Sequence, residues 1–237
     1  MTRDTAPEQS ELERPTPSQT VGPYFTLGMK LGNVIAREDT EGERIRIEGN
    51  VFDGDGDPIF NVLIELWQAN AHGRYNHPHD QRDVPLDPNF IGFGRTDTDP
   101  HGHYEFRTVK PGPVPFQGDE MQAPHVVLLI HASGVFYPLM TRMYFADDPR
   151  TESDPVLQLV PQGRRRTLLA RPEERDGEKV YRFDIVLRGE SEDLVLLGKK
   201  EGAIVEAAAE GMPSGAGKAE TVFFAIKPET VSVALEE

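Results

Sequence analysis

The sequence predicts an all-β protein, a β-sandwich with long loops and little helix. Its 237 residues include 22 glycines and 20 prolines, which are spread along the whole chain. Short runs rich in β-branched or aromatic residues lie between them, a pattern typical of many short strands joined by tight turns. Such strands bury their apolar faces when two sheets pack together, so a sandwich is the expected architecture.

The first two expected strands span residues 44–52 and 62–67. The first alternates apolar side chains on one face with Arg, Glu and Asn on the other, and the second is apolar except at Glu65. The turn between them, DGDGDP, carries three aspartates, as calcium loops do. However, Pro58 and Ile64 occupy the glycine and glutamate positions of an EF-hand, so we expect a plain hairpin turn.

The later strands are predicted by the same alternation. They lie at 104–108, where KPGP ends the strand, and at 125–132, 139–145 and 181–188. The segment 70–89 is rich in His, Asn, Asp and Pro, which predicts a long loop, and 149–176 has a mixed, partly helical composition. At least six strands are therefore expected.

The chain divides into five parts by composition. A polar leader is expected to be disordered until a partner orders it, and an Ala/Gly-rich insertion reads as a linker or loose helix. The parts are a disordered leader (1–15), an N-terminal arm (16–30), the β-sandwich core (31–190), the low-complexity insertion (191–219) and a C-terminal strand segment (220–237). Within the insertion, PSGAGK is similar to a phosphate-binding loop, but Met212 and Ala219 replace the required glycine and Ser/Thr.

Charge and residue usage exclude several classes of function. The chain has 40 acidic and 25 basic residues, and its net charge of −15 repels nucleic acid and anionic membranes. It has no cysteine, so any metal must be held by oxygen or imidazole ligands. No apolar run approaches a membrane span and no signal peptide is visible. We expect a cytoplasmic protein with no nucleic-acid and no membrane partner.

Two closely spaced histidine pairs are expected to be solvated loop residues rather than metal ligands. His77 and His79 form one closely spaced pair, and HGH at 101–103 forms another, both beside Pro or Gly in polar turns. His125 and His131 share a strand face, but six residues at strand spacing separate them by roughly 20 Å. They therefore cannot bind the same ion.

Seven runs together resemble the intradiol ring-cleaving dioxygenases. They occur in the family's order and cover most of residues 16–190: TPSQTVGPYF (16–25), ELWQANAHGRYNH (65–77), LDPNFIGFGRTDTD (86–99), YEFRTVKPGP (104–113), APH (123–125), TRMYF (141–145) and YRFDIVLRGE (181–190). The resemblance implies a β-sandwich with its active site in long loops, which agrees with the strand pattern.

The resemblance also implies a ferric site that this chain has lost. In the family, Fe(III) is held by two tyrosines and two histidines, and a nearby arginine stabilises charge on the substrate. Tyr75 and His125 match two of the ligands, whereas Val114 and Val127 stand at the other two and Gln122 replaces the arginine. Valine has no lone pair to donate. The expectation is therefore no metal and no catalytic residue in this chain, with Tyr75 and His125 as hydrogen-bonded pocket residues.

This pattern resembles the non-iron-binding α subunit of a two-chain member of the family. The resemblance implies a homologous β subunit that holds Fe(III), and a small aromatic substrate at a pocket shared by the two chains. The arm is implied to lie at that pocket through Thr20, Gly22 and Pro23. From the residues alone, an arm that docks on a partner and one that packs on its own sandwich are equally expected.

Two other functions remain open at this point. One is a stand-alone ligand-binding β-sandwich without catalysis. The other is an active iron enzyme that takes ligands from His77 or His79. The insertion before ETVFF (220–224) also leaves open how the C-terminal strand pairs.

Overall fold

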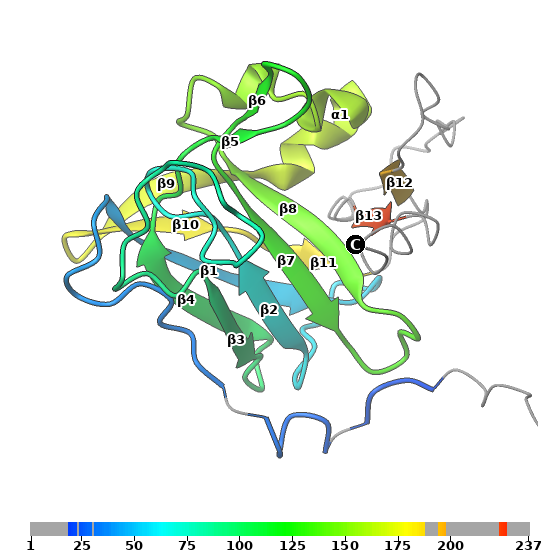
Figure 1. Ribbon diagram of the computed structural model, residues 1–237. Coiled ribbons are helices and arrows are strands. Elements are labelled where there is room, and N and C mark those ends of the chain that lie inside the picture. Colours follow the sequence, from blue (N-terminus) through cyan, green and yellow to red (C-terminus); the bar gives the residue numbers. More distant parts are fainter. Residues whose placement is uncertain (1–18, 23, 30, 188–193, 198–222, 227–237) are drawn as a thin grey trace, which may run out of the picture.

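The computed structural model describes residues 19–22, 24–29, 31–187, 194–197 and 223–226 (Figure 1). The leader predicted at 1–15 lies outside these residues, as does most of the insertion at 191–219. Inside the insertion, where a linker or loose helix was expected, Leu194–Leu197 form strand β12. Strand β13 (Phe223–Ile226) falls in the C-terminal segment and pairs with both β12 and β8.

The regular secondary structure of the described residues is almost entirely strand, which confirms the all-β class. The strands are β1 (Arg44–Phe52), β2 (Leu63–Trp67), β3 (Phe93–Asp97), β4 (His103–Val109), β5 (Val114–Pro115), β6 (Met121–Gln122), β7 (His125–His131), β8 (Leu139–Phe145), β9 (Leu169–Arg175), β10 (Glu178–Arg182) and β11 (Ile185–Val186). Helical structure in these parts is limited to α1 (Gln162–Arg165) and the 3-10 turns Thr151–Ser153, Leu157–Leu159 and Arg166–Leu168. None of these helices is long and apolar enough to cross a membrane.

The strands form two layers that remain joined through β9. Its first residues, Leu169 and Ala170, pair with β8, whereas Arg171–Arg175 pair with β10. The main path runs β11-β1-β10-β9-β8-β7-β2-β3, and β4 pairs with β1. Alternate residues of both layers point inward to one core, which includes Ile45, Ile47, Ile64, Leu66, Phe106, Leu128, Ile130, Met143, Phe145 and Tyr181.

The strand expected at 181–188 is split in the structure. β10 ends at Arg182 and β11 begins at Ile185, and both pair in parallel with β1. At the break the Phe183 N–H donates to the Glu48 carbonyl (2.8 Å). The Phe183 carbonyl also lies so close to Gly49 that a Cβ there would meet it at 1.9 Å. Because glycine has no Cβ, Gly49 lets the backbone at Phe183 lie directly against β1 at the break between β10 and β11.

The aspartate-rich turn reverses the chain locally, through an antiparallel bridge between Phe52 and Pro58. It does not join a hairpin of the two expected strands, because β1 pairs with β4, β10 and β11 whereas β2 pairs with β3 and β7. Asp53 Oδ1 accepts hydrogen bonds from the backbone N–H groups of Asp55 (3.0 Å) and Asp57 (2.9 Å). A side chain that caps its own turn in this way explains the aspartate without a cation.

The outer face of the β2–β7–β8 layer positions the candidate site. Since Val126, Leu128 and Ile130 point into the core, the odd-numbered residues of β7 point outward. The β5–β6 hairpin lies at one end of this layer and the N-terminal arm runs past the other end (Figure 1). The two regions singled out from the sequence therefore lie at opposite ends of β7.

Candidate functional site

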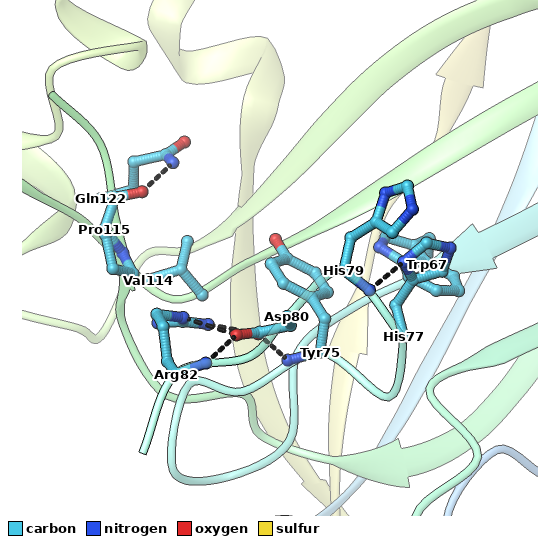
Figure 2. Close-up of a pocket in the computed structure, with 9 residues that line it drawn as sticks. All are labelled: Trp67, Tyr75, His77, His79, Asp80, Arg82, Val114, Pro115 and Gln122. Carbon is cyan, nitrogen blue, oxygen red and sulfur yellow. Dashed lines mark hydrogen bonds and ion pairs between the residues drawn. The ribbon is translucent and has the colours of Figure 1, made fainter. Parts of the chain in front are cut away.

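A cavity of about 510 Å³ opens between the loop after β2 and the β5–β6 hairpin. Its wall is formed by aromatic, aliphatic and polar side chains: Trp67, Tyr75, His77, His79, Asp80, Arg82, Val114, Pro115 and Gln122 (Figure 2). Three of the five positions implied by the family resemblance, Tyr75, Val114 and Gln122, thus line one cavity.

Tyr75 is fixed in this wall by its backbone and by its ring. Its N–H donates to Asp80 Oδ2 (2.8 Å), and its ring stacks on Trp67 with centroids 5.8 Å apart and planes 8° from parallel. Burial raises the pKa of the phenol, so it stays protonated at neutral pH. Its hydroxyl forms no hydrogen bond with another described residue.

The Asp80–Arg82 pair holds the loop in place. The Arg82 guanidinium donates to Asp80 Oδ1 (2.8 Å) and Oδ2 (2.5 Å) and to the Gly73 carbonyl (2.7 Å). Hydrogen bonding to Arg82 lowers the pKa of Asp80 to about 2, so the carboxylate is charged at neutral pH. Gly73, at φ 79°, lies directly against the Pro113 carbonyl, which keeps this loop close to β5.

Val114 and Gln122 are cross-strand neighbours in the β5–β6 hairpin. Val114 is buried and faces the Tyr75 ring across the cavity (Figure 2). Gln122 Nε2 donates to the Pro115 carbonyl (2.8 Å), and its Oε1 accepts from Arg142 (2.7 Å). Both polar ends of Gln122 are therefore used within this chain.

His125 lies buried at the start of β7, outside the cavity wall. Its Nδ1 lies 2.8 Å from the Ala123 carbonyl, which can only accept, so Nδ1 carries the proton. Its ring lies 5.7 Å from that of Tyr144, the residue opposite it on β8. Burial, aided by the charge of Arg142, lowers the pKa of His125 to about 3, and the imidazole is neutral.

Arg142 connects these positions, and the sequence did not single it out. It is the cross-strand partner of Val127, and it donates to Gln122 and to the Tyr144 hydroxyl (3.4 Å). Its positive charge adds to the lowering of the pKa of His125 and partly opposes the rise that burial causes in the pKa of Tyr75. A fixed cation therefore stands among the five positions that resemble the family's iron site.

These residues do not fit a ferric ion. Val114 and Val127 have no lone pairs, so of the four expected ligands only Tyr75 and His125 remain. The Arg142 guanidinium repels a further cation at the same place. Among the described residues, no group of three or more His, Cys, Asp or Glu side chains is arranged to hold a metal.

The rim histidines do not supply the missing ligands. Both are exposed, as the sequence predicted, but they also line the cavity. The His77 ring packs edge-on against Trp67 (6.0 Å) and lies 5.0 Å from the ring of His79. Their contacts are aromatic, which gives no support to an iron site built from them.

Acid is expected to destabilise the chain through His125. The unfolded imidazole titrates near 6.5 and the folded one near 3, so between these values the unfolded state binds the extra proton. The free energy of unfolding should fall by roughly 1.4 kcal/mol per pH unit as pH drops through this window. Thermal unfolding of His125→Gln at a series of pH values is expected to show a flatter dependence. The exposed control His79→Gln is expected to behave like the unchanged chain, and an equal flattening in both variants would contradict the assignment.

The arm lies at the far end of β7 from this cavity. Thr20 Oγ1 accepts from the Gly134 N–H (2.6 Å), Ser133 Oγ donates to the Val21 carbonyl (3.1 Å), and the Phe25 ring lies 5.6 Å from His131. Gly22 lies between these contacts, and Pro23 is outside the described residues. The arm thus packs on its own chain, while Tyr24 and Leu27 remain 78% and 76% exposed.

Comparison with known proteins places these features in a family. A family model described as "Dioxygenase" matches residues 21–189. The chain is 39% identical to the protocatechuate 3,4-dioxygenase alpha chain of Pseudomonas putida, over 77% of this chain and 96% of that one. It is 42% identical to the protocatechuate 3,4-dioxygenase beta chain of Burkholderia cepacia, over 66% of this chain and 69% of that one.

A solved structure shows the same architecture. The crystal structure of 3-chlorocatechol 1,2-dioxygenase from Rhodococcus opacus 1CP superimposes with a TM-score of 0.54 and 26% identity. The match covers 74% of this chain and 73% of that one. The sequence comparison and the fold comparison therefore both relate this chain to dioxygenases.

Proposed function

The chain belongs to the intradiol dioxygenase family, and we propose that it is the non-iron-binding α subunit of a protocatechuate 3,4-dioxygenase. That enzyme class uses O2 to cleave 3,4-dihydroxybenzoate between its hydroxyl groups, giving 3-carboxy-cis,cis-muconate. The observation that carries the proposal is the replacement of two metal-ligand positions by Val114 and Val127 on a retained scaffold.

The choice between the two subunit types rests on the site, because the chain resembles both α and β relatives. An iron-bearing chain needs four ligands, and here only Tyr75 and His125 remain, with the Arg142 guanidinium hydrogen-bonded to Gln122 among the same five positions. A catalytic role for this chain alone has no chemical support from these residues. Relatives named as subunits of an oligomeric enzyme also favour the subunit over a stand-alone binding protein.

The partner we propose is a homologous β subunit that holds Fe(III), and the pair works in the cytoplasm on a small aromatic substrate. The surface that supports a partner is the arm. It is anchored at Thr20 and Phe25 but leaves Tyr24 and Leu27 exposed, and large exposed apolar side chains of this kind are typical of contact surfaces.

Purification of this chain alone and together with a co-expressed β chain tests the proposal. The expected result is co-purification, with bound iron and cleavage of 3,4-dihydroxybenzoate only in the pair. Ring cleavage and stoichiometric iron in the lone chain would refute the non-catalytic assignment. Failure of every β-type chain to co-purify would refute the subunit assignment.

Thr20, Gly22 and Pro23 are proposed to form this chain's part of the shared pocket. In the pair, Thr20→Val removes the hydroxyl that fixes the arm to Gly134. Loss of one such hydrogen bond is expected to raise KM for 3,4-dihydroxybenzoate by about 2- to 10-fold while iron content stays the same. Steady-state kinetics measure this effect, and Ser153→Ala, at an exposed 3-10 turn of the core, is the control. An unchanged KM would show that Thr20 does not contribute to the substrate pocket.

A further inference from the structure

The cavity at Tyr75 retains the wall of a binding site although its metal ligands are lost. Its volume of about 510 Å³ lies within the range of small-molecule sites in proteins. Val114 and Pro115 line the cavity on the side opposite the Tyr75 ring without filling it (Figure 2). Space for a small molecule therefore remains beside Tyr75 although the metal ligands are missing.

The apolar part of the wall suits a flat ring. Tyr75 is backed by the parallel ring of Trp67, so its orientation is fixed before any ligand arrives. Val114 and Pro115 lie opposite it and supply an aliphatic surface. An aromatic ring that enters this space gains an offset-stacked or edge contact on one side and aliphatic packing on the other.

The polar part of the wall suits an oxygen that carries negative charge. The Tyr75 hydroxyl has no hydrogen-bond partner among the described residues, and in Figure 2 it points away from the Asp80–Arg82 pair. Arg82, which is paired with Asp80, lines the cavity, and Arg142 lies behind its wall, where it donates to Gln122. The hydroxyl is thus a hydrogen-bond donor in a locally positive field.

We propose that this cavity is a metal-free binding site for a small aromatic carboxylate, with Tyr75 as hydrogen-bond donor and Arg142 as the fixed positive charge in place of a metal ion. The site belongs wholly to this chain. The inference goes beyond the proposed function, because it needs neither the partner's iron nor ring cleavage.

The single tryptophan of the chain gives a direct readout. Trp67 is the one Trp among the 237 residues and stacks on Tyr75, so a ligand in the cavity changes its emission. The full chain is titrated with benzoate in the presence of EDTA, with calorimetry as a second readout. Saturable binding of benzoate is expected, and neutral benzyl alcohol is expected to bind at least tenfold more weakly because it cannot use the positive field.

Two variants and one control locate the ligand. Val114→Phe fills the space opposite Tyr75 and is expected to abolish saturable binding, and Tyr75→Phe removes the donor and is expected to weaken it roughly tenfold. Tyr137→Phe, at an exposed residue of the β7–β8 turn, is the matched control and is expected to bind as the unchanged chain does. No saturable response to benzoate, equal affinity for benzyl alcohol, or full binding by both cavity variants would overturn the proposal. If Val114→Phe does not fold, Tyr75→Phe alone decides between these outcomes.

Discussion

Val114→Tyr together with Val127→His is expected to restore tight iron binding to this chain only when Arg142→Gln is added. The two substitutions complete a set of two phenols and two imidazoles with Tyr75 and His125, and such a set suits Fe(III). The Arg142 guanidinium, however, is hydrogen bonded at Gln122 and acts on both retained ligands. Repulsion between this fixed charge and a trivalent ion in a partly buried site is large. The triple variant is therefore expected to bind iron more than tenfold tighter than the double variant.

Metal titration measures this difference, and a visible tyrosinate-to-iron absorption band identifies the ligands. Adding Arg107→Gln to the double variant is the matched control, because Arg107 lies on β4 with a side chain that is 53% exposed. The control is expected to bind iron as the double variant does. Equal iron affinity in the double and triple variants would show that Arg142 does not oppose the metal.

Asp154→Ala is expected to lower the free energy of unfolding by about 3–5 kcal/mol. Asp154 is buried, and its carboxylate accepts hydrogen bonds from the Ala123 N–H (2.7 Å), the Tyr144 hydroxyl (2.9 Å) and the N–H groups of Val156 (2.9 Å) and Leu157 (2.7 Å). Alanine leaves these buried donors without an acceptor. Because Ala123 in turn accepts from His125, the substitution also loosens the start of β7.

Urea denaturation measures this loss, and a second capping aspartate provides the comparison. Asp99 accepts from the N–H groups of His101 (2.8 Å) and His103 (2.9 Å), but it lies in an exposed turn. Water replaces its hydrogen bonds, so Asp99→Ala is expected to cost no more than about 1 kcal/mol. Similar losses of unfolding free energy in both variants would show that burial does not increase the contribution of Asp154 to stability.

Strands with clear alternation or a continuous apolar run were predictable from the sequence, and strands with few apolar residues were not. β1, β4, β7 and β8 follow the expected pattern of inward apolar residues. β3 (FGRTD) and β9 (LARPEER) are short of apolar residues and were not predicted. β9 is a strand because it pairs with β8 at one end and with β10 at the other, and so bridges the two layers. These pairings depend on the tertiary structure and cannot be predicted from the local sequence.

The residues of the candidate site were likewise only partly predictable from the sequence. Resemblance to a family identified Tyr75, Val114 and Gln122, and the structure brings these three to one cavity, with His125 and Val127 behind it on β7. Arg142 was missed because its position depends on the β7–β8 register, which places it opposite Val127. The signal was present in TRMYF, where a charged residue alternates with buried ones, but the pairing partner cannot be read from one strand.

This chain is proposed not to hold the iron of the enzyme, and metal analysis of the co-purified pair tests this most directly. The pair is prepared with Tyr75→Phe and His125→Gln in this chain, which removes both remaining ligand-type side chains. The iron content and the tyrosinate-to-iron band are expected to equal those of the unchanged pair. A loss of iron from the altered pair would show that Tyr75 or His125 binds the metal and would contradict the account.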